Sequence, residues 1–156
     1  MKLQELHQEL KKNMDLMNEL IRKSGYEEYE EVDVDMIEDY GSLNPDERQL
    51  CKACCRFIEK LAVIKENMEY YERSIDKEGT LHWNPRTERY EFAGIELHCG
   101  YGFEILVYDD FTESYTWEYT TIEMDRSRED NPNKEGYYLT AHSKLAIEGL
   151  QARHRA

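Results

Sequence analysis

The sequence predicts an α+β protein, with an N-terminal antiparallel helical hairpin followed by a small antiparallel β-barrel or curled sheet of six to seven strands. Two apolar rows with alternating three- and four-residue steps occupy the first half of the chain. From Gly79 onward the pattern changes to period-two alternation, with glycines and Asn-Pro pairs where turns are needed. Helices followed by strands, without βαβ alternation, are typical of α+β folds. We therefore expect two parts, residues 1–76 and 77–156.

The net charge limits the classes of partner. The chain has 156 residues and a formal net charge of -14, from 34 acidic and 20 basic residues. Nucleic acids and anionic membrane surfaces are recognised through clustered Lys and Arg, so neither is expected as a direct ligand. A basic protein partner fits this charge.

Both predicted helices carry an apolar row. The first is expected over 2–24, with a stop at Ser24-Gly25. The second should begin at Pro45, with Asn44 as N-cap and Glu47 completing a capping box, and run to about Ser74 or Ile75. We expect the rows to pack against each other, within one chain or across a homodimer. Their members are Leu3, Leu6, Leu10, Met17 and Leu20 in the first helix and Leu50, Cys54, Phe57, Leu61, Ile64, Met68 and Tyr71 in the second.

An acidic connector over residues 26–43 joins the helices. It is either a solvated loop that packs a few aromatic side chains or a carboxylate-rich surface that docks into a basic groove. A calcium loop is not expected, because the Asp33-x-Asp35 pair lacks the required Gly and Glu spacing. The candidate partner-binding residues are Glu27, Glu28, Glu30, Glu31, Asp33, Asp35, Glu38 and Asp39.

The cysteines predict free thiols and no metal or other cofactor. Cys51, Cys54 and Cys55 lie within one helical turn and have no facing ligand pair, so we expect them to act as small buried hydrophobic residues. A site built from His82, His98 and Cys99 is the weaker alternative. Free thiols, the amphipathic N-terminus without a signal peptide and the lack of a membrane span together predict a cytoplasmic protein.

The β region divides into short segments separated by turn residues. The expected strands are 80–83, 89–92, 95–99, 103–108, 115–124 and 136–141, with a final edge strand over about 150–153. Aromatic side chains on these strands supply the core of a small domain. Glu104 and Glu123 lie within apolar strands, and we expect them to pair with Arg89 or Arg126 rather than to act as catalytic carboxylates.

The segments G-T-L-x-W-N, R-Y-E, G-I-E-L-H-C-G, F-E-I-L, Y-T-W-E-Y-T-x-I-E, G-Y-Y-L and I-E-G-L-Q-A-R carry a family resemblance. Over about residues 79–153 the chain resembles a small family of uncharacterised β domains, known only as a domain of unknown function. That family occurs in Firmicutes, often on phages, plasmids and conjugative elements. The resemblance implies a mobile-element setting and no catalytic residues.

No recognised catalytic motif occurs in the sequence, so we do not expect an enzyme. The first hypothesis is a phage or mobile-element antagonist that binds a basic, nucleic-acid-handling host protein through its acidic surface. The most specific version of this hypothesis is an anti-CRISPR inhibitor that mimics nucleic acid. The alternatives are a structural or dimerising accessory protein of a mobile element and an enzyme using Glu104, Glu123 or His98.

Overall fold

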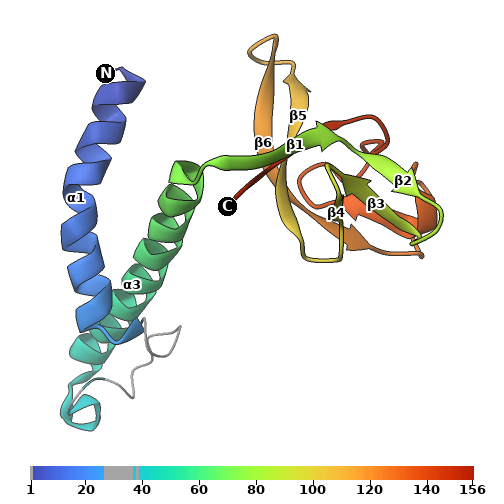
Figure 1. Ribbon diagram of the computed structural model, residues 1–156. Coiled ribbons are helices and arrows are strands. Elements are labelled where there is room, and N and C mark those ends of the chain that lie inside the picture. The colour runs from blue at the N-terminus through green and yellow to red at the C-terminus, as the bar shows by residue number, and fades with distance from the viewer. Residues whose placement is uncertain (1, 27–36, 38) are drawn as a thin grey trace. The chain divides into compact units, whose positions relative to one another are not determined.

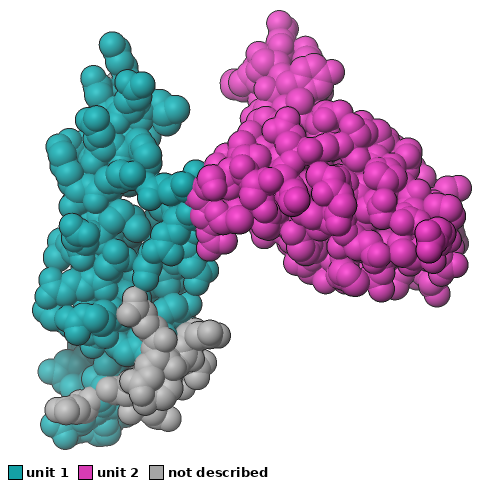
Figure 2. All heavy atoms as spheres, viewed as in Figure 1, with its two compact units in different colours: residues 1–72 teal, residues 73–156 magenta. Residues whose placement is uncertain are grey.

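The chain forms two compact units, residues 1–72 and 73–156 (Figures 1 and 2). The computed structural model describes residues 2–26, 37 and 39–156. The first unit contains two long helices, and the second contains two antiparallel sheets. The α+β class predicted from the sequence is therefore confirmed. In the described part of the chain, no helix combines the length and apolar character needed to cross a membrane.

Both helices begin, and α1 also ends, where local chemistry predicts. Helix α1 spans Leu3–Lys23 and stops before Gly25, whose φ of 79° is the left-handed conformation that glycine adopts easily. Helix α3 spans Pro45–Glu72 and follows the short 3-10 helix η2, Tyr40–Ser42. The capping box is formed: Glu47 N–H donates to Asn44 Oδ1 at 3.0 Å, and Asn44 N–H donates to Glu47 Oε2 at 2.8 Å.

The helices form an antiparallel hairpin, but the centre of their contact does not lie on the rows expected from the sequence. Ile21 of α1 packs against the α3 row of Cys55, Ile58 and Ala62. This contact row lies one residue C-terminal to the predicted α3 row, which includes Phe57 and other exposed side chains. The expectation that the predicted rows meet within one chain is therefore met only in part: Leu61 of the predicted α3 row is partly buried against this contact. The centre of the contact lies one residue further along, because small and β-branched side chains there allow close helix packing.

Helix α3 ends three residues before strand β1 begins, so its expected extension to Ile75 is also wrong. Strand β1 spans Ile75–Thr80 and pairs with β8, Gln151–Arg155, at the end of the chain. The sequence of β1 has no alternation, and its burial pattern is almost entirely exposed. This strand exists because β8 satisfies its backbone, a long-range partner that local propensity does not reveal.

The β unit contains eight strands in two antiparallel sheets rather than six or seven in one. The larger sheet has the order β1-β8-β5-β6-β7, and the smaller has the order β2-β3-β4. The remaining strands are β2 His82–Asn84, β3 Arg89–Phe92, β4 Ile95–Glu96, β5 Gly102–Asp109, β6 Ser114–Met124 and β7 Tyr137–Leu139.

The predicted barrel is not confirmed. Within residues 73–156, all of which the structure describes, β1 and β7 end one sheet and β2 and β4 end the other, so neither sheet closes. The segment expected as an edge strand, β8, lies inside the larger sheet between β1 and β5. Buried side chains from both sheets form a single core, including Tyr90, Phe92, Phe103, Ile105, Ile122 and Leu139.

Candidate protein-interaction site

Most of the acidic residues predicted as a docking surface lie outside the described part of the chain. These are Glu27, Glu28, Glu30, Glu31, Asp33, Asp35 and Glu38. Asp39 is described and exposed. Its φ of 60° is left-handed, and its carbonyl accepts hydrogen bonds from the Ser42 N–H and hydroxyl, each at 2.8 Å. The structure therefore gives Asp39 a turn-forming role and does not test the rest of the surface.

A second acidic surface lies on the hairpin of β5 and β6. Strand β5 pairs with β8 only at Glu104 and Ile105, whereas it pairs with β6 along its whole length to Asp109. From Leu106 to Trp117 this hairpin is a two-stranded ribbon, which we call the arm. Figure 1 shows the arm projecting beyond the other strands of the β unit, and it forms a protrusion in Figure 2.

The turn at the end of the arm is ordered by its own side chains. Asp109 Oδ1 accepts the backbone N–H of Phe111 at 2.9 Å, and its Oδ2 accepts the Thr112 hydroxyl at 2.7 Å. The Thr112 hydroxyl also lies 2.9 Å from the Ser114 hydroxyl. These bonds hold Phe111 away from the protein, and its side chain is 95% exposed. The phenyl ring thus stands at the end of a fixed turn with nothing of its own unit covering it.

The end of the arm is acidic, and the arm contains no basic residue. No Lys or Arg occurs between Arg89 and Arg126 in the sequence. Asp109, Asp110 and Glu113 surround Phe111 in the chain, and the hydrogen bonds from Thr112 and the Phe111 backbone lower the pKa of Asp109. The end of the arm therefore combines negative charge with an exposed aromatic ring.

Aromatic side chains continue down one face of the arm. Tyr108 and Tyr115 face each other across the ribbon with ring centroids 5.4 Å apart and an interplanar angle of 74°. Trp117 follows, covered by the Arg153 guanidinium at 4.2 Å, and then Tyr119. Tyr115 and Tyr119 are exposed. Edge-to-face and cation–π contacts fix these rings in place, so the face is preorganised for contact.

Glu104 is buried at the base of this face and is structural. Its side chain is 1% exposed and lies between two arginines from β8. Arg153 Nε donates to one carboxylate oxygen, and Arg155 Nε donates to the other at 3.0 Å. The partner expected from the sequence was Arg89 or Arg126, and both pair elsewhere. Two positive charges neutralise Glu104, and the burial of its side chain keeps the carboxylate away from solvent.

The other residues considered for catalysis are also dispersed. Glu123 is half-buried on β6, opposite Tyr138 of β7. Arg89 pairs with Glu96 at 3.8 Å, and Arg126 pairs with Glu135 at 3.2 Å. The structure does not place a nucleophile and a base together at Glu123, Arg89 or Arg126.

Three histidines each contact a single carboxylate. His82 lies 2.9 Å from Glu91, and His142 lies 2.8 Å from Glu118. His154 lies 2.8 Å from Asp76. The Thr80 carbonyl and Glu91 raise the pKa of His82, whereas hydrogen bonds from Asn84 and His82 lower the pKa of Glu91.

The residues considered as metal ligands do not form a cluster. His98 and Cys99 lie in an exposed turn after β4. Among all residues that the structure describes, no three His, Cys, Asp or Glu side chains gather as metal ligands. All four cysteines are free. Cys55 is buried, and its burial raises the pKa of its thiol, but Cys54 is exposed, so the expectation of a buried thiol cluster is wrong for Cys54.

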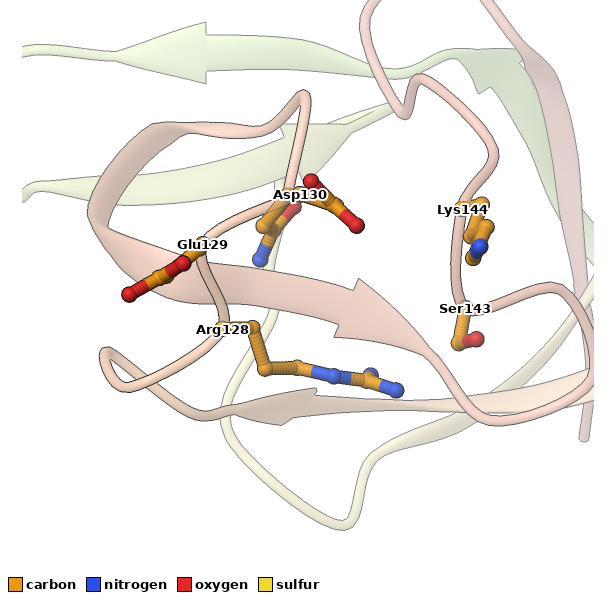
Figure 3. A pocket seen from close by; sticks show the side chains of 6 residues that line it. Arg128, Glu129, Asp130, Ser143 and Lys144 are labelled. Carbon is orange, nitrogen blue, oxygen red and sulfur yellow. The ribbon is translucent and has the colours of Figure 1, made fainter.

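The β unit also has a polar hollow of about 240 Å³ between the β6–β7 connection and the segment after β7. Figure 3 shows Arg128 extending toward Ser143 while Glu129 points away from the hollow. Arg128 also stacks on Tyr138 at 4.3 Å. Two basic and two acidic side chains line the hollow, so it has no charge preference. Its lining residues are Arg128, Glu129, Asp130, Asn131, Ser143 and Lys144.

Sequence reasoning placed the end of the arm in a turn but did not recognise it as a site. The signal was present in the segment Y-D-D-F-T-E-S-Y, where an aromatic residue occupies a turn between two tyrosines. An apolar residue in a turn is unusual because turns are exposed. Attention to that one residue would have identified the surface.

Comparison with known proteins assigns a domain but no activity. Residues 79–154 match the model of a domain of unknown function, DUF5348. The match agrees with the expected uncharacterised domain family to within one residue at its end. It starts inside β1 and includes the arm. No curated protein matches the chain, and no solved structure matches it.

Proposed function

We propose that this chain is a non-catalytic protein-binding module whose arm engages a basic partner protein. The observation that carries the proposal is the 95% exposure of Phe111 on a turn held by Asp109. An exposed aromatic ring on a rigid support loses little conformational entropy on binding, and interface hot spots are often such anchors. The surrounding carboxylates would select a pocket with a basic rim.

The acidic balance of the whole chain supports the same class of partner. A net charge of -14 speeds association with a basic protein and opposes contact with nucleic acid. In its more specific form, the proposal is that the partner is a host protein that handles nucleic acid, for example a CRISPR nuclease. The chain itself would then come from a mobile element. The connector residues Glu27, Glu28, Glu30 and Glu31 would add to the acidic surface in that case.

The test uses the full chain as bait in host lysate and compares it with Phe111→Ser and Asp110→Asn/Glu113→Gln variants. Proteins retained by the wild type should be basic. The serine variant should lose them by at least about tenfold, the loss expected for a hot spot. The charge variant should show weaker retention at low salt and a flatter salt dependence, because salt screens the carboxylates.

A matched control is the exposed phenylalanine of α3, Phe57→Ser, which should retain the same proteins. Replacing the four connector glutamates by glutamine tests the connector separately. If the Phe111 and Phe57 variants retain the same proteins as the wild type, the arm is not the binding surface.

A further inference from the structure

The tyrosines of the arm lie on its solvent face. Tyr108 lies opposite Tyr115, and Trp117 follows two residues later, so these three side chains share one face of the ribbon. The other face carries Ile105 and Val107, which belong to the buried core of the β unit. Tyr108 is 52% exposed and Tyr115 is 69% exposed. The face with the aromatic rings is therefore the one that a partner can reach.

The pair of Tyr108 and Tyr115 leaves ring surface free for a further contact. The two rings meet edge to face, with centroids 5.4 Å apart and an interplanar angle of 74°. Such a contact uses one face of one ring and the edge of the other. The remaining ring faces carry the negative side of the aromatic quadrupole, which attracts a cation placed within about 6 Å. The tyrosine pair is therefore suited to hold a positively charged group.

The same face of the arm already holds a guanidinium group. Arg153 from β8 lies over the Trp117 ring at 4.2 Å, and its Nε donates a hydrogen bond to the Glu104 carboxylate. Stacking on a ring and hydrogen bonding to a carboxylate thus satisfy one arginine at the same time. Tyr115 lies two residues before Trp117 on the same strand, a distance of about 7 Å. The tyrosine pair thus offers a second aromatic surface next to the one that Arg153 occupies.

Carboxylates lie close to the tyrosine pair in the chain. Asp109, Asp110 and Glu113 all lie between the two tyrosines, in the turn at the end of the arm. The buried group of one carboxylate and two arginines at the base of the arm has one net positive charge, so the three carboxylates of the turn outweigh it. No Lys or Arg belongs to the arm itself. The end of the arm is therefore complementary to a cation.

We propose that the pair of Tyr108 and Tyr115 is a binding site for an arginine side chain of the partner protein. The inference rests on the function proposed for the arm and names the side chain that the arm recognises. A guanidinium is planar and weakly hydrated, so it stacks on a tyrosine ring while its N–H groups donate to a carboxylate. A lysine ammonium is a strongly hydrated point charge and gains mainly from the carboxylates. Arginine is therefore preferred over lysine at the same net charge.

The position of Phe111 defines the surroundings of that arginine. Phe111 lies in the turn that connects Tyr108 to Tyr115, and hydrogen bonds to Asp109 hold this turn. A partner surface that fits the arm therefore has an apolar pocket for the phenyl ring and an arginine beside the pocket. Two neighbouring features are required rather than positive charge in general, so the arm discriminates among basic proteins.

Two synthetic peptides test the preference without the partner. In each peptide cationic residues alternate with glycine, and these residues are all arginine in one peptide and all lysine in the other. NMR titrations of the full chain at about 50 mM salt, where screening is limited, give the dissociation constants. The wild type should bind the arginine peptide about two- to fivefold more tightly, the ratio that an exposed cation–π contact supplies. The largest shifts should centre on Tyr108 and Tyr115.

Substitutions separate stacking from charge. Tyr108→Leu/Tyr115→Leu should bring the arginine peptide down to the affinity of the lysine peptide, whereas Tyr108→Phe/Tyr115→Phe keeps the rings and should keep the preference. Asp110→Asn/Glu113→Gln should weaken binding of both peptides, because the carboxylates attract either cation. The matched control Tyr71→Leu removes an exposed tyrosine of α3 and should behave like the wild type. A tryptophan-fluorescence unfolding transition shows that each variant is folded.

Equal affinities of the two peptides for the wild type would overturn the proposal, and so would an arginine preference that survives the loss of both tyrosine rings. Binding of neither peptide would overturn it as well. In each of these cases the arm remains the binding surface if Phe111→Ser loses the proteins retained from lysate. Conversely, an arginine preference that depends on the tyrosines, with Phe111→Ser retaining every protein, would refute Phe111 as the anchor and leave the arginine site standing.

Discussion

Removing the charge of Glu104 should destabilise the β unit strongly. Glu104→Gln keeps the shape of the side chain but leaves Arg153 and Arg155 without their shared carboxylate. The two arginine side chains are only 14% and 15% exposed, so water cannot replace the lost partner fully. The variant also affects two strand pairings, because β8 links β5 to β1.

The expected loss follows from the burial of the pair. Breaking a buried ion pair by removing one partner costs about 3–5 kcal/mol, because the remaining charge is left uncompensated. For a domain of this size each kcal/mol lowers the unfolding midpoint by about 4–8 °C. The midpoint should therefore fall by at least about 12 °C.

Tryptophan fluorescence is the suitable assay, since both tryptophans, Trp83 and Trp117, belong to the β unit. The matched control is Glu96→Gln, which breaks the more exposed pair with Arg89 and should cost less than about 1 kcal/mol. A Glu104→Gln variant that unfolds within about 1 kcal/mol of the wild type would refute the structural role assigned to this carboxylate.

Two further substitutions and one labelling experiment have defined outcomes. Gly136→Ala should lower the same fluorescence midpoint, because φ is +80° and the new Cβ would lie 2.8 Å from a backbone carbonyl of the β6–β7 connection; an unchanged midpoint would contradict this. Glu91→Gln should lower the pKa of His82 in an NMR titration, since Glu91 and the Thr80 carbonyl raise it above 6.5. The stabilisation from this pair is full below pH 6.5 and is lost as pH rises through the folded pKa, so a stability difference confined to alkaline pH would be the wrong sign. Cys55 should react with iodoacetamide more slowly than the exposed cysteines, because burial raises its thiol pKa; equal rates would contradict its position.

Local chemistry predicted the elements that depend on neighbouring residues. Asn44 and Glu47 cap α3 as expected, and β3 and β6 match their predicted limits closely. Strand β1 was missed because its partner, β8, is more than seventy residues away in the chain. The same distance effect hid the partners of Glu104, which lie on the adjacent strand β8 but 49 and 51 residues further along the chain.

The helical rows show a different limit of sequence reasoning. The heptad pattern correctly located an apolar row on each helix, but the pattern does not say which surface covers it. Ile58 and Ala62, one residue further along, form the contact within the chain. The sequence also put the emphasis for the docking surface elsewhere. Clustered carboxylates favoured the connector, whereas the proposed surface on the arm has one exposed ring, Phe111, and three nearby acidic residues.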